Sequence, residues 1–445
     1  MLAKSLVVAV LSFCAVVAAP LAAAAPQAAA CPAALPADAR CYNGQDEAGA
    51  FYWIAVPARW NHVLVVHAHG GPELGTPRLD RTEEDLKRWA VMVKAGYAWA
   101  GSSYRRGGYG VTMAAEDTER VRQLFVRELG PQLGLPRRTV LHGQSYGGGV
   151  AAKAVELFAT AADGRSPYDA VLLTSGVLGG GTQAYDFRLD LRVVYQYVCG
   201  NHPQPDEPAY PLWQGLPPGA KMTREELARR VDDCTGIGHP AAQRSPEQRR
   251  RLADILNVVR IPEKSLLGHL GWATWLFEDL VHKRLQGRNP FGNEGVAYRG
   301  SSDDAALNAG VLRYRADPQA VAALAADSDP SGRLPVPVLT LHAIDDPTAF
   351  VELESAYRDI VAAAGQGDRL VQVFSAESEH SYLSDPEYPA LMTALLDWVD
   401  RGERPTPEAV AQRCEAARAR FGGACHLRPD YRSPPLASRV PPRRP

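Results

Sequence analysis

Two stretches of the chain alternate β-branched apolar runs with amphipathic helical patterns, and this alternation restricts the fold more than any other feature. The first stretch opens with the apolar run 63–67, which ends at Gly70-Gly71-Pro72 and so predicts a buried strand followed by a sharp loop. Strands are expected at 63–67, 96–101, 139–142, 169–177, 336–342 and 370–374, and helices at 83–94, 114–129, 150–158, 351–364 and 388–399. Strands that alternate with helices indicate an α/β protein with a mostly parallel sheet and helices on both faces.

The rest of the chain differs in composition from these two stretches. The segment between them is rich in helix formers, Trp and Tyr, which predicts a helical cap inserted after a sheet strand. After Gly402, 8 of the last 43 residues are Pro, which predicts an extended strap without a periodic core. The expected division is a signal peptide at 1–30, a first core part at 31–180, a helical cap at 181–332, a second core part at 333–402 and a Pro-rich tail at 403–445.

The N-terminus has the pattern of an export signal. Lys4 is followed by an uncharged apolar stretch, and small residues suited to cleavage lie between Ala23 and Ala30. A retained membrane anchor is the first alternative, which Pro20 and the drift to bare Ala disfavour. A lipoprotein with Cys31 lipidated is the second, and the apolar stretch ends too early for it. The expected location is therefore secreted or periplasmic, with no stable membrane anchor.

The cysteines agree with an oxidising compartment. Cys14 lies in the leader, and the other six of the seven fall into three close pairs. Six cysteines allow about 15 connectivities, and we expect nearest neighbours to pair because each pair sits in its own segment. The expected bridges are Cys31–Cys41, Cys199–Cys234 and Cys414–Cys425. No pair has the C-x-x-C spacing, so neither a redox nor a metal site is expected.

Charge and composition exclude several classes of protein. The chain has 48 Lys and Arg against 50 Asp and Glu, which leaves no basic excess for nucleic acid. Hydrophobic residues at 46% and charged residues at 22% are ordinary for a globular protein and exclude both a disordered chain and a polytopic membrane protein. No cofactor is expected.

The sequence Gly143-Gln-Ser145-Tyr-Gly147 lies between an expected strand and an expected helix. This is the context of a nucleophile elbow, in which a sharp turn projects the Ser hydroxyl outward. Small residues are required two positions before and after the Ser, because side chains would clash there. The alternative is a structural Gly-rich turn with an idle Ser. The context favours Ser145 as a nucleophile.

A Ser nucleophile needs a base and an acid, which in this type of fold follow in the order Ser, Asp or Glu, His. Asp345 and Asp346 end one late strand, and His380 follows the next. Asp346 is the preferred acid because Pro347 fixes the turn after it, and Asp345 stays an alternative. Four other histidines on or beside strands compete for the base: His67, His69, His142 and His342. His142 and His342 precede the Ser or the acid, which disfavours them.

The oxyanion site is expected at His69-Gly70-Gly71, where the first strand ends. The backbone N–H groups of Gly70 and Gly71, with that of Tyr146, are placed to bind a tetrahedral oxyanion. A plain Gly turn is the alternative. A second Gly-rich loop at 105–110 lacks the G-K-[ST] ending of a phosphate loop and is expected to shape the pocket wall.

These motifs carry a family resemblance. His69-Gly-Gly-Pro72, Arg106-Gly-Gly-Tyr-Gly110 and Gly143-Gln-Ser-Tyr-Gly-Gly148 are similar to the motifs of prolyl-oligopeptidase-like catalytic domains. Over 51–180 and 333–402 the chain resembles secreted serine hydrolases of the α/β-hydrolase superfamily, which implies Ser145 as nucleophile, Asp346 as acid and His380 as base. The N-terminal β-propeller of prolyl oligopeptidases has no room here. The cap with its Cys pair is closer to secreted esterases and lipases, or to proline- and tripeptidyl-aminopeptidases.

The leading functional hypothesis is therefore a secreted hydrolase of carboxylic esters that works through an acyl-enzyme. Its expected partner is a small-molecule or oligomeric acyl substrate. A secreted exopeptidase is the runner-up, in which cap carboxylates would hold the substrate amine. The candidates for that role are Glu207, Asp232, Asp233, Glu278 and Asp279. A non-catalytic binding protein on the same scaffold is the third hypothesis, and a complete set of triad residues in the required order disfavours it. Trp213, Trp272, Trp275 and Phe277 are expected to form the cap's own core or to line an acyl pocket.

Overall fold

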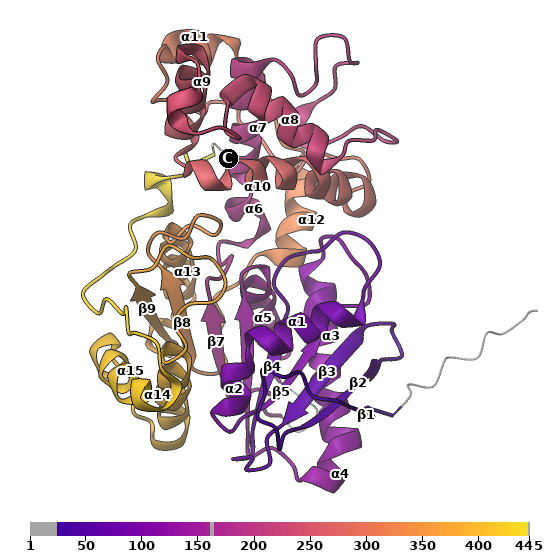
Figure 1. The fold of residues 1–445 in the computed structure, drawn as a ribbon, viewed down its shortest axis with the longest axis vertical. Coiled ribbons are helices and arrows are strands. Elements are labelled where there is room, and N and C mark those ends of the chain that lie inside the picture. The colour runs from indigo at the N-terminus through magenta and orange to yellow at the C-terminus, as the bar shows by residue number, and fades with distance from the viewer. Residues whose placement is uncertain (1–24, 161–163, 444–445) are drawn as a thin grey trace, which may run out of the picture.

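The computed structural model describes residues 25–160 and 164–443, and it is built around one nine-stranded sheet (Figure 1). The strands lie in the order β1-β2-β3-β5-β4-β6-β7-β8-β9. Their bounds are β1 Gln27–Ala29, β2 Arg40–Gln45, β3 Phe51–Val56, β4 Val63–Ala68, β5 Ala98–Ser102, β6 Arg138–Gln144, β7 Ala170–Thr174, β8 Val338–Ala343 and β9 Leu370–Ser375. From β5 to β9 all neighbours are parallel, whereas β1, β2 and β3 pair antiparallel.

The parallel strands are buried on both faces because helices cover both. In β4, Leu64 and Val66 face one hydrophobic core, and Val63 and Val65 face the other. On the first face, α3 (Val111–Leu124) and α5 (Tyr146–Leu157) pack on the sheet, with α13 (Glu352–Ala363) near its far edge. On the second face lie α1 (Leu79–Arg88), α2 (Ala90–Lys94) and α14 (Glu387–Arg401). This three-layer arrangement around a mostly parallel sheet is the α/β-hydrolase fold.

The sheet order brings three loops to one edge. β4 lies between β5 and β6, so the connections of β4 and β6 leave on opposite sides of the sheet and open a crevice at their carboxyl ends. Ala68 pairs with Gly143 in register, which sets the 69–72 loop beside the turn after β6. Ala343 pairs with Ser375, so the loops after β8 and β9 also lie side by side.

The residues between β7 and β8 form a helical layer above this edge (Figure 1). We call residues 180–328 the cap. Its helices are α6 Gly180–Ala184, α7 Asp186–Cys199, α8 Arg224–Thr235, α9 Pro246–Val259, α10 Leu266–Gly271, α11 Asp304–Gly310 and α12 Pro318–Ser328, with π-helical turns at Trp272–Leu276 and Asp279–Arg284. The two crossings between core and cap meet in a neck, where the Thr182 hydroxyl donates to Asp329 at 2.5 Å and the Gly181 N–H donates to the Ser328 hydroxyl at 3.1 Å.

The C-terminal region corrects the expectation of a wholly extended tail. Pro407–Phe421 form the helix α15, which packs on α14. Thr406 caps this helix by accepting the N–H of Ala409, and Pro407 is its first residue, where the missing N–H costs nothing. The chain after α15 is largely extended and runs along the core to the cap, where Arg443 pairs with Asp186 and Asp190. The last segment therefore ties the core to the cap.

The N-terminal expectation is tested only in part, because residues 1–24 of the predicted leader lie outside the described residues. Gln27–Ala29 pair with Cys41–Asn43 as strand β1, so the last residues assigned to the leader belong to the sheet. Backbone pairing with a neighbouring strand explains how a strand forms here without β-branched residues. Among the residues that the structure describes, no helix has the length and hydropathy needed to cross a membrane.

The structure contains three disulfides, in the predicted nearest-neighbour pairing. Cys31–Cys41 joins the loop after β1 to β2, Cys199–Cys234 joins α7 to α8 within the cap, and Cys414–Cys425 closes the end of α15. Bridges of this kind persist in oxidising compartments.

Candidate active site

The turn between β6 and α5 holds Ser145 in a strained backbone conformation, with φ 58° and ψ −124°. Its N–H donates to the carbonyl of Thr174 at 3.0 Å, and its carbonyl accepts the N–H of Val177 at 3.0 Å. The glycines around it have no room for a side chain, since a Cβ at Gly143 would meet the carbonyl of Gly147 and one at Gly147 would meet that of Ala68. Residues 143–147 therefore form the tight turn that their sequence predicts.

Ser145, His380 and Asp346 lie in one hydrogen-bonded line. The Ser145 hydroxyl is 2.7 Å from His380 Nε2, and His380 Nδ1 is 2.8 Å from Asp346 Oδ2. A carboxylate accepts only, so Nδ1 carries the imidazole proton and Nε2 is free to accept the hydroxyl proton. The Asp346 side chain is fully buried, whereas that of His380 is 18% exposed. The imidazole can thus exchange protons with solvent while the carboxylate is shielded from it.

Of the two adjacent aspartates, it is Asp346 that faces His380. Its other oxygen accepts the N–H groups of Thr348 and Ala349 at 2.8 and 3.0 Å, in the turn that Pro347 begins. Asp345 is exposed and its side chain makes no hydrogen bond in the described part of the chain. These two backbone N–H groups, with His380 Nδ1–H, hold the Asp346 carboxylate toward the imidazole.

The four competing histidines are buried below the site and have other partners. His69 Nδ1 lies 2.5 Å from Asp85, and His67 Nδ1 lies 3.0 Å from His142 Nδ1. Burial lowers the pKa of His67 to about 3 and holds that of His142 well below its usual range, so both are neutral. His342 donates to the carbonyl of Ala349 at 2.8 Å and contacts Glu354. None of the four reaches the Ser145 hydroxyl.

The predicted oxyanion residues lie together at the end of β4 and the start of α5. Tyr146 is the first residue of α5, where a helix leaves its N–H groups without internal partners. A Cβ at Gly70 would clash with the Gln144 side chain, and Gly71 has φ 82°, which a residue with a side chain rarely adopts. The Tyr104 hydroxyl donates to the carbonyl of His69 at 2.8 Å and so fixes the start of this loop.

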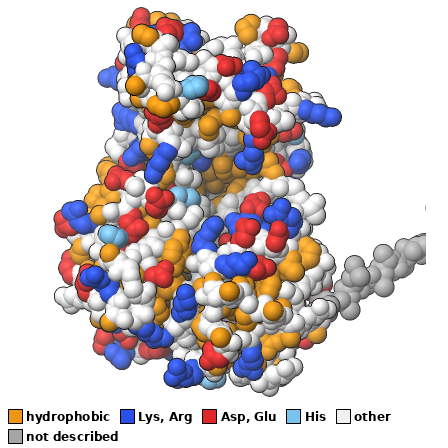
Figure 2. Space-filling model, viewed as in Figure 1, with side chains coloured by type: hydrophobic (Ala, Val, Ile, Leu, Met, Phe, Trp, Pro, Cys, Tyr) orange, Lys and Arg blue, Asp and Glu red, His pale blue; other side chains and the backbone are white. Residues whose placement is uncertain are grey.

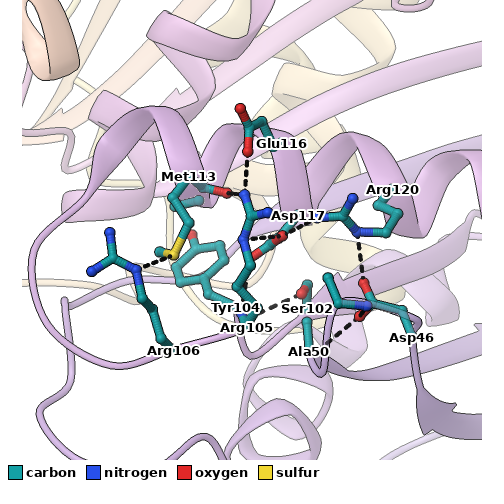
Figure 3. A network of polar contacts seen from close by, with 12 residues as sticks. Asp46, Ala50, Ser102, Tyr104, Arg105, Arg106, Met113, Glu116, Asp117 and Arg120 are labelled. Atoms are coloured by element: carbon teal, nitrogen blue, oxygen red, sulfur yellow. Dashed lines mark hydrogen bonds and ion pairs between the residues drawn. The ribbon is translucent and has the colours of Figure 1, made fainter. Parts of the chain in front are cut away.

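A polar network that sequence reasoning missed holds the Gly-rich loop 105–110 in place (Figure 3). Asp117 on α3 is fully buried, and its carboxylate accepts the backbone N–H of Arg105 at 2.7 Å and pairs with Arg120 at 2.5 Å. Arg120 in turn donates to Asp46 at 2.9 Å. Burial raises the pKa of Asp117, which its two arginine partners oppose. The loop is therefore anchored to the core at its first residue.

The cap holds the other end of this loop. Asp279 is buried and accepts the N–H of Tyr109 at 2.9 Å, and a Cβ at Gly108 would run into its carboxylate. Asp327 accepts the N–H groups of Val111 and Thr112 at 2.9 and 3.1 Å. Core and cap thus share hydrogen bonds beside the Ser145 turn, and Figure 2 shows an indentation between them in which hydrophobic side chains gather.

A cap histidine that the sequence did not single out contacts the loop that carries Asp346. His269 on α10 is buried, and its Nε2 donates to the carbonyl of Pro347 at 3.0 Å. Burial, together with Arg188 and His380, holds the pKa of His269 well below its usual range. His269 therefore lies as a neutral contact between the cap and the loop that carries Asp346.

The cap aromatics divide between two roles. Phe277 is buried and stacks on Phe291 with ring centroids 4.5 Å apart, inside the cap's own core. Trp272 instead stacks on Tyr185 at 4.3 Å and is only half-buried, on the side of the cap that faces Tyr109. The expectation that most of them form the cap's core is thus met by Phe277 and not by Trp272.

Comparison with known proteins adds a distant likeness. No family model matches the sequence, and no curated protein matches it. Among solved structures the chain is similar to feruloyl esterase B from Aspergillus oryzae, with 14% identity and a TM-score of 0.44 over 83% of this chain and 82% of that one. It is also similar to the rice cell wall degrading esterase LipA from Xanthomonas oryzae, with 13% identity and a TM-score of 0.37 over 76% and 83% of the two chains. Likenesses at this distance concern the fold alone.

Proposed function

We propose that the protein is an exported serine hydrolase that cleaves carboxylic esters through an acyl-enzyme. The observation that carries this proposal is the hydrogen-bonded line from the Ser145 hydroxyl through His380 to Asp346. An idle Ser in a Gly-rich turn has no need of a buried carboxylate behind its histidine partner. The three disulfides support export.

In the proposed reaction, Ser145 attacks the ester carbonyl as His380 Nε2 takes the hydroxyl proton. Asp346 keeps the proton on Nδ1 and stabilises the imidazolium that forms. The N–H groups of Tyr146, Gly70 and Gly71 hold the negative charge on the carbonyl oxygen. His380 then gives its proton to the departing alkoxide, and water attacks the acyl-enzyme by the same route in reverse. A preorganised oxyanion site contributes about 3–4 kcal/mol for each donor.

The exopeptidase alternative lacks a specific contact in the described residues. A terminal amine needs a carboxylate that is free to receive it, and the cap candidates have partners of their own. Glu207 pairs with Arg230, Asp233 with Arg229, and Asp279 with Lys283 and the Tyr109 amide. Asp232 accepts the N–H of Gly238 and contacts His239. Burial raises the pKa of Glu278, the remaining candidate, which weakens it as an anion.

The test is covalent labelling with a fluorophosphonate, which reacts only with an activated Ser. Wild-type protein is expected to label, and Ser145→Ala is expected to lose both labelling and hydrolysis of p-nitrophenyl esters while melting within a degree or two of wild type. A matched control is Ser175→Ala, because Ser175 also has a positive φ of 45° at the end of a neighbouring strand. Labelling of the Ser145 variant to the wild-type extent would overturn the assignment.

A further inference from the structure

Arg188, on the cap helix α7, is a buried guanidinium without a counter-ion. The residue is 4% exposed, and no carboxylate lies within ion-pair distance of it among the described residues. Its one hydrogen bond goes to the carbonyl of Ala184 at a long 3.4 Å, and its Nε has no partner. Burial lowers the pKa of Arg188 to about 10, which still leaves it charged at neutral pH. An isolated buried charge costs several kcal/mol, so this one calls for an explanation.

Aromatic rings surround the guanidinium but do not replace an anion. Its central carbon lies 5.1 Å from the ring of Tyr185, 4.6 Å from that of Phe187 and 4.6 Å from that of Trp272. Desolvated cation–π contacts are attractive, but they offset only part of the cost of burial. The rings offer no in-plane acceptor, so Nε has no partner and Nη1 has only the carbonyl of Ala184.

The neighbouring Arg192 shows what a structural arginine in this helix looks like. It is fully buried one turn further on, and it donates to the carbonyl of His202 at 3.1 Å and contacts the Tyr210 hydroxyl and the Gly215 carbonyl at 3.3 and 3.5 Å. Those acceptors are fixed parts of the cap. Arg188 has no such set, although it lies on the same helix and is buried to a similar extent.

The rings around Arg188 are connected to the reacting groups by contacts on two sides. On one side, the ring centroid of Tyr109 lies 5.6 Å from that of Tyr185 and also 5.6 Å from that of Tyr146, the residue next to Ser145. On the other side, the Phe187 ring is 5.0 Å from His269, which donates to the carbonyl of Pro347 beside the triad acid. Trp272 is half-buried and Arg188 itself is 4% exposed, so the guanidinium lies close to the solvent-accessible surface.

We propose that Arg188 binds a carboxylate of the substrate, so that the preferred substrates are esters with a carboxylate group a few bonds from the scissile carbonyl. This deepens the ester hydrolase proposed above and rests on it. One guanidinium suits the single charge and planar shape of a carboxylate, whereas a phosphate monoester carries close to two charges. The flat faces of Tyr185 and Trp272 suit an apolar spacer between carboxylate and ester. A buried cation also repels the ammonium group that an aminopeptidase must bind.

The test compares esters that differ only in charge. Mono-4-nitrophenyl adipate carries a carboxylate, and 4-nitrophenyl hexanoate and methyl 4-nitrophenyl adipate are its neutral counterparts. The kcat/KM of wild type is expected to favour the charged ester by about 10- to 100-fold, the range of a charge-assisted hydrogen bond. In Arg188→Met this ratio is expected to fall to one or below. Arg224→Met is the matched control, because Arg224 lies over Trp275 on the exposed side of the cap, and it is expected to keep the ratio.

Thermal melting separates a binding role from a structural one. Removal of an unpaired buried charge is expected to leave the Tm of Arg188→Met equal to or above that of wild type, whereas Arg192→Met is expected to lower it. A fall in the Tm of Arg188→Met with an unchanged ester ratio would overturn the proposal. So would a wild-type enzyme that hydrolyses the neutral esters as well as the charged one, a result that needs no variant.

Binding without turnover separates the two proposals from each other. In the Ser145→Ala background, adipate at 10 mM, a concentration of roughly 10 Kd for a ligand that binds at about 1 mM, is expected to raise the Tm, and hexanoate is not. Addition of Arg188→Met is expected to abolish this shift. If wild type fails to label with fluorophosphonate while adipate still shifts the Tm, the hydrolase proposal fails and the carboxylate site stands. If labelling succeeds and adipate has no effect, the carboxylate site fails alone.

Discussion

The core and the cap treat a buried ionisable group in opposite ways. In the core, Glu387 is fully buried at the start of α14, and burial raises its pKa to about 8, so that the carboxyl is neutral at pH 7. In the cap, Arg188 keeps its charge under similar burial, because a guanidinium does not lose its proton in this range. Glu387 can therefore lose its charge by protonation, whereas Arg188 stays charged and, under our proposal, is neutralised only by a bound carboxylate.

The largest expected effect separates the two adjacent aspartates of the core. Asp346→Asn is expected to lower kcat by about 10⁴, because an amide cannot hold the proton on His380 Nδ1 in the same way. Asp345→Asn is the control, and it is expected to keep most of the activity because Asp345 is exposed. Steady-state kinetics on a p-nitrophenyl ester would check this. An inactive Asp345→Asn variant together with an active Asp346→Asn variant would contradict the assignment of Asp346 as the residue that orients His380.

The next effect tests how far the core depends on the cap. Replacement of Cys199 and Cys234 by Ser opens a loop with a sequence separation of 35, which in the chain-entropy model costs about 4 kcal/mol of unfolding free energy. Replacement of Cys31 and Cys41 opens a separation of 10 and is expected to cost about 3 kcal/mol. Urea denaturation would measure both.

Fluorophosphonate labelling of the same two variants sharpens this comparison. Because Ser145, His380 and Asp346 all lie in the core, the variant without the cap bridge is expected to label at the wild-type rate under native conditions, although its unfolding midpoint is lower. Loss of labelling in this variant, with a folded core, would mean that the cap helps to assemble the triad.

The smallest effect concerns the pH dependence of stability. The pKa of Glu387 is raised from 4.5 to about 8, so its contribution is fully present below pH 4.5 and is lost as the pH rises toward 8. Glu387→Gln keeps a neutral group that can accept the N–H of His426, which lies 2.9 Å from the carboxyl. The variant is expected to be on the order of 1–3 kcal/mol more stable than wild type above pH 8 and similar to it near pH 4.5. Urea melts across this range would show it, and Glu379→Gln, an exposed neighbour, is expected to change nothing.

The parallel strands of the core could be predicted from the sequence because their apolar, β-branched residues suit strands that are buried on both faces. Runs such as 63–67 and 336–342 are β-branched and apolar, and both faces of a parallel strand are buried, so pattern and structure match. The order of Ser145, Asp346 and His380 followed from their places after successive strands. The choice of Asp346 over Asp345 rested on Pro347, whose turn supplies the two backbone N–H groups that hold the Asp346 carboxylate.

Strand β2 and helix α15 are among the elements that escaped prediction, because composition hid their local signals. Strand β2 has the sequence Arg40-Cys-Tyr-Asn-Gly-Gln45, with few residues that favour strands, and its pairing with β3 forms it. Helix α15 lies in a Pro-rich region, and the count of prolines outweighed the Thr406-Pro407 start signal and the Ala-rich run after it.

The contacts that hold the loop 105–110 and the loop after β8 could not be predicted for a different reason. Asp117, Asp279 and His269 are polar residues on helices, where the usual location is a solvated face. Only the path of the chain brings them to the Gly-rich loop and to Pro347. Arg188 likewise carries no sequence signal, since nothing in α7 distinguishes it from Arg192.

The neck at Thr182 and Asp329 has a consequence for how readily the cap can be exchanged. The two ends of the cap leave and rejoin the core within one hydrogen bond of each other, so the insertion closes on itself before it meets the sheet. A segment with adjoining ends can be exchanged for a shorter or longer one with little cost in loop-closure entropy and without moving β7 or β8. Under our proposal the residue that selects the substrate lies in α7, so substrate preference would be exchanged together with the whole cap. Exchange of the cap would then change the substrate preference and leave Ser145, His380 and Asp346 in place.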